Sequence, residues 1–169
     1  VHLHAAGSSG EGAGTQGGGD QTAGEWSMYR GDLAATGASP LNQITTGNVG
    51  DLAEVWTYSL AAVSEEARGP NSQVTPIVVD GVMYVPAADR VVALDPDTGR
   101  EIWRHGVTEG RPSRRGVAYW GGEAGMSPRI IFTTGQHLRA IDAATGDVVE
   151  SFGDAGAVDM VVPYNSVPL

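Results

Sequence analysis

One short motif occurs twice in this 169-residue chain at a fixed interval. Each copy reads Ala, an aliphatic residue, Asp, two further residues, Thr and Gly: A-L-D-P-D-T-G at 93–99 and A-I-D-A-A-T-G at 140–146. The two Asp residues, Asp95 and Asp142, are 142 − 95 = 47 residues apart. Because a fixed period of this size is typical of repeat architectures, the motif constrains the chain to copies of one unit packed side by side.

The residues around the first copy predict four short antiparallel strands. Ile77–Val79 and Val82–Val85 flank Asp80-Gly81, a dipeptide typical of a tight hairpin turn with positive φ. Two further strands are expected over Val91–Leu94 and Arg100–Arg104, joined by the D-x-x-T-G turn. In such a turn Asp accepts backbone N–H bonds and Gly adopts the left-handed conformation.

The second copy predicts the same four strands. They are expected over Gly116–Trp120, Arg129–Phe132, Leu138–Ile141 and Asp147–Phe152, with a longer loop after the first. Four strands per unit at this period indicate the blade of a β-propeller, since known blade repeats run about 40–50 residues. The expected fold is therefore all-β, an incomplete arc of two to three four-stranded blades.

The residues before the repeat differ from it in composition. Residues 1–24 contain eight Gly and few residues that could be buried, so they are expected to form a disordered leader. Residues 25–169 are expected to form the propeller part, beginning with a helical turn over Asn48–Leu52 and an alternating strand around Trp56.

Charge and composition exclude several other functions. The net charge of −10 argues against nucleic acid as a partner, because a phosphate backbone repels such a surface. The absence of Cys excludes disulfides and thiolate metal sites. Asp95 and Asp97 resemble the start of a calcium loop, but its twelfth position holds Gly106 instead of Glu, and Ala144 replaces Asp97 in the second copy. A structural turn is the better interpretation.

An ordered set of phrases resembles one known family. The phrases are W-S-M-Y-R-G-D, S-P-L-N-Q-I-T, T-P-I-V-V-D-G-V-M-Y-V, R-R-G-V-A-Y-W and P-R-I-I-F-T-T-G-Q-H-L-R-A-I-D-A-A-T-G. Together they resemble the amino-terminal part of quinoprotein dehydrogenases, which use pyrroloquinoline quinone (PQQ), over residues 25–169. The closing F-G-D-A-G-A-V-D-M is similar to the glucose-dehydrogenase-like branch.

The resemblance implies a fold, a reaction and a location. Members are eight-bladed propellers that hold PQQ and a divalent metal, usually calcium, near the propeller axis. They oxidise sugars or alcohols in the periplasm or cell envelope, some with a membrane anchor, and pass electrons to a quinone or cytochrome. Alcohol-oxidising members carry a vicinal cysteine pair where this chain has Glu109-Gly110, which favours the sugar-oxidising branch.

The resemblance also implies three cofactor-binding residues. Arg115, in the R-G-V-A-Y-W phrase, corresponds to an Arg that contacts PQQ. Gln73 stands where members typically have a Glu that touches PQQ, and Arg111 stands where some sugar-oxidising members have a His. The catalytic Asp and the metal ligands of the family are expected beyond Leu169, so residues 1–169 alone are expected to be inactive.

The chemistry of the residues agrees with this assignment. PQQ carries three carboxylates, and the planar fork of a guanidinium suits a carboxylate. Arg111, Arg114 and Arg115 form the only basic cluster of an acidic chain. Charge pattern alone favours surface ion pairs for Arg111 and Arg114, whereas the motif favours the cofactor for Arg115. The four tryptophans are expected in the core between blades: Trp26, Trp56, Trp103 and Trp120.

Two other functions are compatible with the turns. Non-enzymatic propellers with PQQ-type repeats, such as scaffolds for outer-membrane protein assembly, share the A-φ-D-x-x-T-G turn, in which φ is an aliphatic residue. They are not expected to carry R-R-G-V-A-Y-W or the S-P-L-N-Q-I phrase. A sugar-binding or interaction propeller that has lost its cofactor is the third reading, and Gln73 is the residue that supports it.

Overall fold

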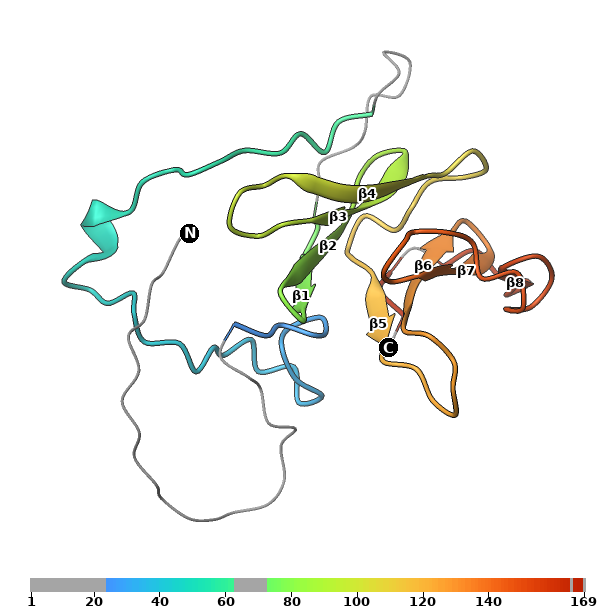
Figure 1. Ribbon diagram of the computed structural model, residues 1–169, viewed down its shortest axis with the longest axis horizontal. Coiled ribbons are helices and arrows are strands. Elements are labelled where there is room, and N and C mark those ends of the chain that lie inside the picture. Colours follow the sequence, from blue (N-terminus) through green and yellow to red (C-terminus); the bar gives the residue numbers. More distant parts are fainter. Residues whose placement is uncertain (1–23, 63–72, 165, 169) are drawn as a thin grey trace.

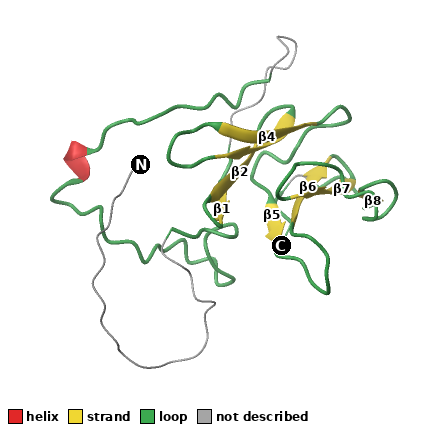
Figure 2. Ribbon diagram, viewed as in Figure 1, coloured by secondary structure: helices red, strands yellow, loops and turns green. Residues whose placement is uncertain are grey.

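The structure is a computed structural model that describes residues 24–62, 73–164 and 166–168. Two four-stranded antiparallel sheets dominate these residues, and one short 3₁₀ helix, Val49–Asp51, precedes them (Figures 1 and 2). The predicted leader, 1–24, lies outside the described residues except for its last residue. None of the described helices is long and apolar enough to cross a bilayer. The first sheet contains β1 (Ile77–Val79), β2 (Val82–Pro86), β3 (Arg90–Leu94) and β4 (Glu101–Gly106), and the second contains β5 (Ala118–Trp120), β6 (Arg129–Thr134), β7 (His137–Asp142) and β8 (Ala157–Asp159).

Each sheet is a meander whose strands lie in chain order. The second strands begin at Val82 and Arg129, and the third strands begin at Arg90 and His137, so both pairs keep the interval of 129 − 82 = 137 − 90 = 47 residues. This regularity confirms the predicted superposition of the two units and the blade architecture. The two sheets splay apart in Figure 1 like neighbouring blades of an open arc.

The D-x-x-T-G turns have the predicted hydrogen bonds. One carboxylate oxygen of Asp95 accepts the amides of Asp97 and Thr98 at 2.9 and 3.1 Å. Asp142 makes the equivalent pair of bonds at 2.8 and 3.1 Å. Both carboxylates therefore stabilise a turn, as expected from the sequence.

The two sheets approach each other through their first strands, β1 and β5. One apolar core fills the space between the sheets, and Phe132 and Ile130 are fully buried in it. In a propeller the strands that approach most closely across a blade joint are those nearest the axis, because the blades diverge outward. β1 and β5 are therefore the inner strands. The buried members of this core are Ile77, Val79, Tyr84, Val91, Ala93, Val117, Ile130, Phe132, Ile141 and Ala143.

Trp103 closes the joint between the sheets at its outer side. Its ring lies directly over Gly146, where an added Cβ would come within 2.7 Å of the indole, and Gly146 has a φ of +78°. The indole Nε1–H donates to the carbonyl of Ala143 at 3.0 Å. Only Gly satisfies both the left-handed backbone and the close approach of the ring. The joint thus depends on one Trp and one Gly from different blades.

Trp56 repeats this arrangement on the other side of the first sheet. Its ring lies over Gly99, and its Nε1–H donates to Pro96 at 3.0 Å, each 47 residues before the equivalent atom of the Trp103 joint. The segment around Trp56 therefore packs on the first sheet in the same way as β4 packs on the second sheet. The prediction of a strand at this position is wrong, because residues 52–60 are extended but pair with no neighbouring strand among the described residues.

Arg90 fixes that extended segment to the first sheet. Its guanidinium donates to the carbonyls of Ser59 and Ala61, each at 2.8 Å, and pairs with Asp89 at 2.7 Å. A second apolar cluster of β2 and β3 side chains packs against Tyr58 from the same segment. The first sheet is consequently covered on both faces, which explains why every residue of β3 is buried.

The predicted fourth strand of the second unit, Asp147–Phe152, is wrong. Val148 forms an isolated bridge with Ile141, and the chain then loops out before β8 pairs with β7. The loop contains Gly153 and Gly156, both with positive φ, which allow the chain to turn back. Residues 147–149 still bond the end of β7, because Asp142 donates to the Asp147 carbonyl and Val149 donates to the Ala140 carbonyl, but the first half of β7 pairs with Ala157–Asp159 instead of residues 150–152.

Only Trp103 lies between the two sheets, because Trp56 packs on the other side of the first sheet and the remaining two tryptophans lie elsewhere, contrary to the prediction. Trp26 bridges Val78 by two backbone hydrogen bonds of 2.9 Å each, on the edge of β1 that β2 leaves free. Trp120 lies at the end of β5, with the guanidinium of Arg129 at 5.1 Å from its ring. Since the free edge of an inner strand faces the axis, Trp26 lies on the axial side of the first blade.

Candidate functional site

Two of the predicted cofactor-binding residues precede the two inner strands. Gln73 is exposed in the stretch that leads into β1, and Arg115 is exposed in the stretch that leads into β5. Both stretches enter their blade from the same end of the arc, because β1 and β5 occupy equivalent positions in the two sheets. The axial rim at this end, defined as residues 73–75 and 111–116, is the candidate site.

A backbone hydrogen bond joins the two stretches. The amide of Thr75, two residues after Gln73, donates to the carbonyl of Arg115 at 2.9 Å. Gly116 permits this approach, since an added Cβ would lie 3.0 Å from the Thr75 carbonyl oxygen and 3.2 Å from Val167. The structure therefore joins the stretches that carry Gln73 and Arg115, which are 42 residues apart in sequence (115 − 73 = 42), on one rim.

Ser113 fixes the backbone that carries Arg115. Its side chain is buried, and its hydroxyl accepts the amide of Arg115 at 3.2 Å. Its own amide donates to the carbonyl of Thr133, at the end of β6, at 3.0 Å. The sequence prediction did not include Ser113. The available signal was a hydroxyl residue two positions before the Arg, a spacing at which Ser accepts local backbone amides.

The three arginines of the rim present free guanidinium groups to the described part of the protein. Arg111, Arg114 and Arg115 are all exposed, and no described Asp or Glu forms an ion pair with any of them. The ion pairs that charge pattern alone favours for Arg111 and Arg114 are thus not found among the described residues. Three exposed cations within five residues, none of them ion-paired to a described Asp or Glu, would suit an anionic ligand better than a neutral one.

Other groups with possible chemical roles make structural contacts and do not bond the three rim arginines. Glu109, where a vicinal cysteine pair would stand, bonds Arg139 at 3.3 Å. His105 lies in β4, with its Nδ1 at 2.9 Å from the Gly146 carbonyl and its ring edge-on to Phe132. His105 therefore belongs to the blade joint. Within the described ranges, no three His, Cys, Asp or Glu side chains gather as metal ligands would.

The fold defines the class of protein: an arc of a β-propeller, here with three exposed arginines on its axial rim. Comparison with known proteins narrows the class. Residues 26–167 match the family described as "PQQ: Glucose/ethanol/alcohol dehydrogenase, beta-propeller domain". The chain belongs to this family, which confirms the resemblance inferred from its phrases. The branch within the family stays a prediction.

The relatives are dehydrogenases of alcohols. The chain is 38% identical over 135 residues to a quinohemoprotein alcohol dehydrogenase of Comamonas testosteroni, covering 74% of this chain and 18% of the relative. It is 40% identical over 133 residues to a 1-butanol dehydrogenase (cytochrome c) of Thauera butanivorans, covering 73% and 18%. It is also 30% identical over 153 residues to the glycerol dehydrogenase large subunit of Gluconobacter oxydans, covering 82% and 21%.

A solved structure shows the same fold. A europium-containing methanol dehydrogenase superposes with a TM-score of 0.68 at 26% identity, covering 88% of this chain and 26% of the other. The chain thus spans about a fifth of the length of the curated relatives and a quarter of the solved structure.

Proposed function

We propose that the protein to which this chain belongs is a PQQ-dependent dehydrogenase that oxidises the CH–OH group of an alcohol or polyol. The single observation that carries the proposal is the rim itself. The Thr75–Arg115 hydrogen bond joins the stretches that carry Gln73 and Arg115, in a family named for this cofactor. The three exposed guanidinium groups of the rim would supply the charge that a tricarboxylate requires.

The donor set of the rim fits PQQ. Arg115 would donate from its guanidinium fork to a carboxylate or quinone oxygen, and Arg111 would balance further negative charge. Gln73 would donate a neutral hydrogen bond from its amide where a Glu would only accept one. When bound, the quinone supplies the redox chemistry by accepting two electrons from the alcohol. The residues of this chain bind and orient the cofactor, and Ser113 holds the backbone of Arg115 in place.

The substrate class follows from the relatives. Their names specify an alcohol dehydrogenase, 1-butanol and glycerol. An alcohol or polyol is therefore the better supported substrate, and glucose, expected from the closing phrase, remains the alternative. We further propose a cytochrome or quinone as electron acceptor and a location in the periplasm or cell envelope.

The metal is part of the same proposal. A divalent ion, calcium in the simplest case, would accompany PQQ, while the solved relative named above contains europium. Within the described ranges no set of three suitable side chains gathers. The metal ligands would therefore come from other residues of the protein.

Cofactor titration of the full-length protein tests the proposal. Arg115→Ala should weaken PQQ binding by about 1.5–3 kcal/mol, the scale of a hydrogen bond to a charged group. Arg100→Ala, which removes an equally exposed guanidinium outside the rim, should leave the affinity unchanged. Equal PQQ affinity for Arg115→Ala and the parent would remove Arg115 from the site. No PQQ binding by the parent would instead support the scaffold or cofactor-free propeller.

A further inference from the structure

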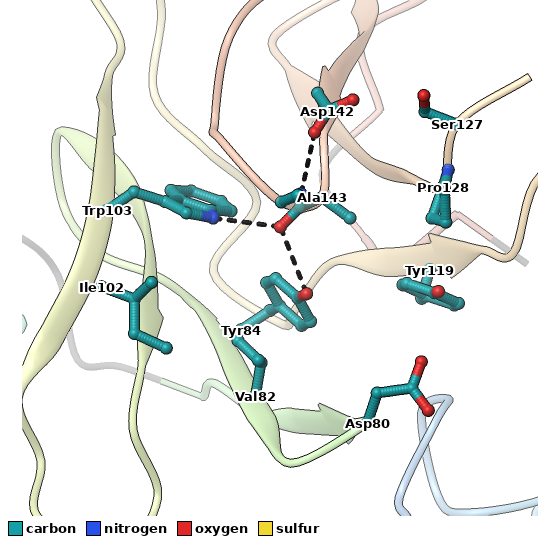
Figure 3. A pocket seen from close by; sticks show the side chains of 11 residues that line it. Asp80, Val82, Tyr84, Ile102, Trp103, Tyr119, Ser127, Pro128, Asp142 and Ala143 are labelled. Carbon is teal, nitrogen blue, oxygen red and sulfur yellow. Dashed lines mark hydrogen bonds between the residues drawn. The ribbon is translucent and has the colours of Figure 1, made fainter.

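A cavity opens between the two blades at the end opposite to the rim. Its volume is about 320 Å³, within the range of small-ligand sites. Asp80, which follows the last residue of β1, lies at this end, whereas Thr75 precedes the first residue of β1 at the rim. Figure 3 shows the side chains converging on the cavity from both sheets. They are Asp80, Val82, Tyr84, Ile102, Trp103, Tyr119, Ser127, Pro128, Asp142, Ala143 and Ala144.

Three aromatic side chains form the walls of the cavity. The ring centroids of Tyr84 and Tyr119 are 6.3 Å apart, and those of Tyr84 and Trp103 are 5.9 Å apart. The Tyr84 hydroxyl and the Trp103 Nε1–H both donate to the carbonyl of Ala143, at 3.2 and 3.0 Å. These two bonds satisfy the polar atoms of both side chains and hold their rings in fixed positions (Figure 3).

The charge around the cavity is negative. Asp80 is exposed at the mouth, and its amide donates to the carboxylate of Glu25 at 3.0 Å, which places a second acid beside it. None of the described residues that line the cavity is an Arg. The carboxylate of Asp142 accepts two turn amides through one oxygen, so Asp80 is the acid that faces a ligand most freely.

Both tyrosines remain neutral in this setting. Burial raises the pKa of Tyr84 to about 12, with Tyr119, Asp80 and Asp142 adding to the effect. Burial also raises the pKa of Tyr119, and the carboxylates of Asp80 and Glu25 raise it further. The cavity therefore offers neutral π-systems, with the carboxyl group of Asp80 exposed at its mouth.

We propose that this inter-blade cavity binds a small organic ammonium ion. Neutral aromatic side chains attract an alkylammonium through their quadrupole, and the Asp80 carboxylate at the mouth, with Glu25 beside it, supplies the counter-charge. A metal ion would need more oxygen ligands than the described lining offers, and an anion would be repelled by Asp80 and Glu25. The cavity lies at the opposite end of β1 from Arg115, so the proposed site does not depend on the cofactor.

The geometry of the Asp80-Gly81 turn allows a substitution that changes the charge without changing the backbone. Asp80 has a φ of +50° and precedes Gly81, at +73°, so the two residues form a hairpin turn with left-handed backbone at both positions. Asn adopts this conformation as readily as Asp does. Asp80→Asn therefore removes the charge and keeps the turn.

The test is a ¹H saturation-transfer titration of the full-length protein with tetramethylammonium chloride at constant ionic strength. tert-Butanol serves as the neutral ligand of similar shape, and neither compound has a CH–OH group that a dehydrogenase could oxidise. The parent should bind tetramethylammonium saturably and tert-butanol less tightly. Asp80→Asn should weaken tetramethylammonium binding by about fivefold, while dehydrogenase activity is unchanged.

Two further variants place the site. Glu54→Gln removes one exposed charge from the segment before β1 and should leave binding unchanged. Val82→Met, which adds volume to a cavity wall, should abolish the saturable signal. The proposal is overturned if tetramethylammonium shows no saturable binding, if tert-butanol binds as tightly, or if Asp80→Asn binds like the parent.

Discussion

The two blades share their turns and inner strands but differ in their outer strands. In the first blade, β3 turns through D-P-D-T-G directly into the six-residue β4, which carries Trp103. In the second, β7 turns through D-A-A-T-G into the single bridge at Val148, and only the three-residue β8 completes the sheet. The same turn therefore leads to a regular strand in one blade and to a broken strand in the other.

The difference shows which parts of a blade are locally encoded. The Asp, Thr and Gly of each turn make their hydrogen bonds within five residues, so the turn forms wherever these residues occur. The outer strand depends on its partner in the next blade. Trp103 has such a partner in Gly146, whereas no Trp stands at the equivalent position 150, which holds Glu150.

The largest expected effect tests whether the two tryptophan joints are equivalent. Trp103→Ala should lower the free energy of unfolding by about 3–4 kcal/mol, because it removes a large ring from the joint and leaves Ala143 with one donor fewer. Trp56→Ala should cost less, since its segment is extended but unpaired and can collapse onto the sheet. Urea denaturation measures both. Equal costs would show that the Trp56 segment is as firmly held as β4.

The next effect concerns the Gly on which each ring rests. Gly146→Ala should destabilise the protein by about 2–3 kcal/mol, from a strained φ together with a clash against the Trp103 ring. Gly81→Ala is the matched control: its φ is +73°, but nothing lies within 4 Å of an added Cβ, so only the strain remains. If both variants cost the same in thermal denaturation, the ring contact contributes nothing.

A smaller effect concerns the clamp on the first blade. Arg90→Met should cost about 2 kcal/mol, because two backbone carbonyls lose a charged donor while the apolar stem is kept. The amides of residues 58–61 should exchange faster with deuterium. His137→Met, at the equivalent position of the second blade, should leave them unchanged, since no described segment is bound there in the same way. Unchanged exchange in Arg90→Met would contradict the clamp.

The smallest effect is a pH dependence of the joint. Burial lowers the pKa of His105, and Arg139 adds to this, while the bond to the Gly146 carbonyl and Asp147 oppose it. Because the folded pKa lies below the unfolded value of about 6.5, the stability contribution is complete above that pH and is lost as the pH falls through the folded pKa. The stability difference between the parent and His105→Gln should therefore shrink from pH 7.5 to pH 5.5 in urea titrations. A difference that is constant over this range would refute the role of His105.

Most strands could be predicted from the sequence, and the exceptions have a physical cause. Asp80-Gly81 and the D-x-x-T-G turns fix where strands end, so the strands between them were located to within two residues. Residues 147–152 have strand composition, but only the first three pair with β7, and Ala157–Asp159 take the place of residues 150–152 opposite its first half. The segment around Trp56 alternates like a strand, but no described strand lies beside it to pair with.

The candidate site was predictable only in part. Arg115 and Gln73 stand in phrases of the family, and the structure brings their stretches together. Their adjacency rests on the Thr75–Arg115 hydrogen bond between two blades, which no local pattern encodes. Ser113 was not predicted, although its spacing from Arg115 is a local pattern. Its burial depends on packing against β6, which the local sequence does not show. The cavity beside Asp80 is formed by two blades together and has no signature within either copy.

The bridge between Trp26 and Val78 has a consequence for the order of folding. The two residues are separated by 78 − 26 = 52 positions, whereas β1 and β2 pair across a two-residue turn. Closing a long loop costs more chain entropy than closing a hairpin, and the edge on which Trp26 docks exists only after β1 has formed. During synthesis the residues around Trp26 leave the ribosome before β1 does. They can pair with Val78 only after β1 has been made and has folded.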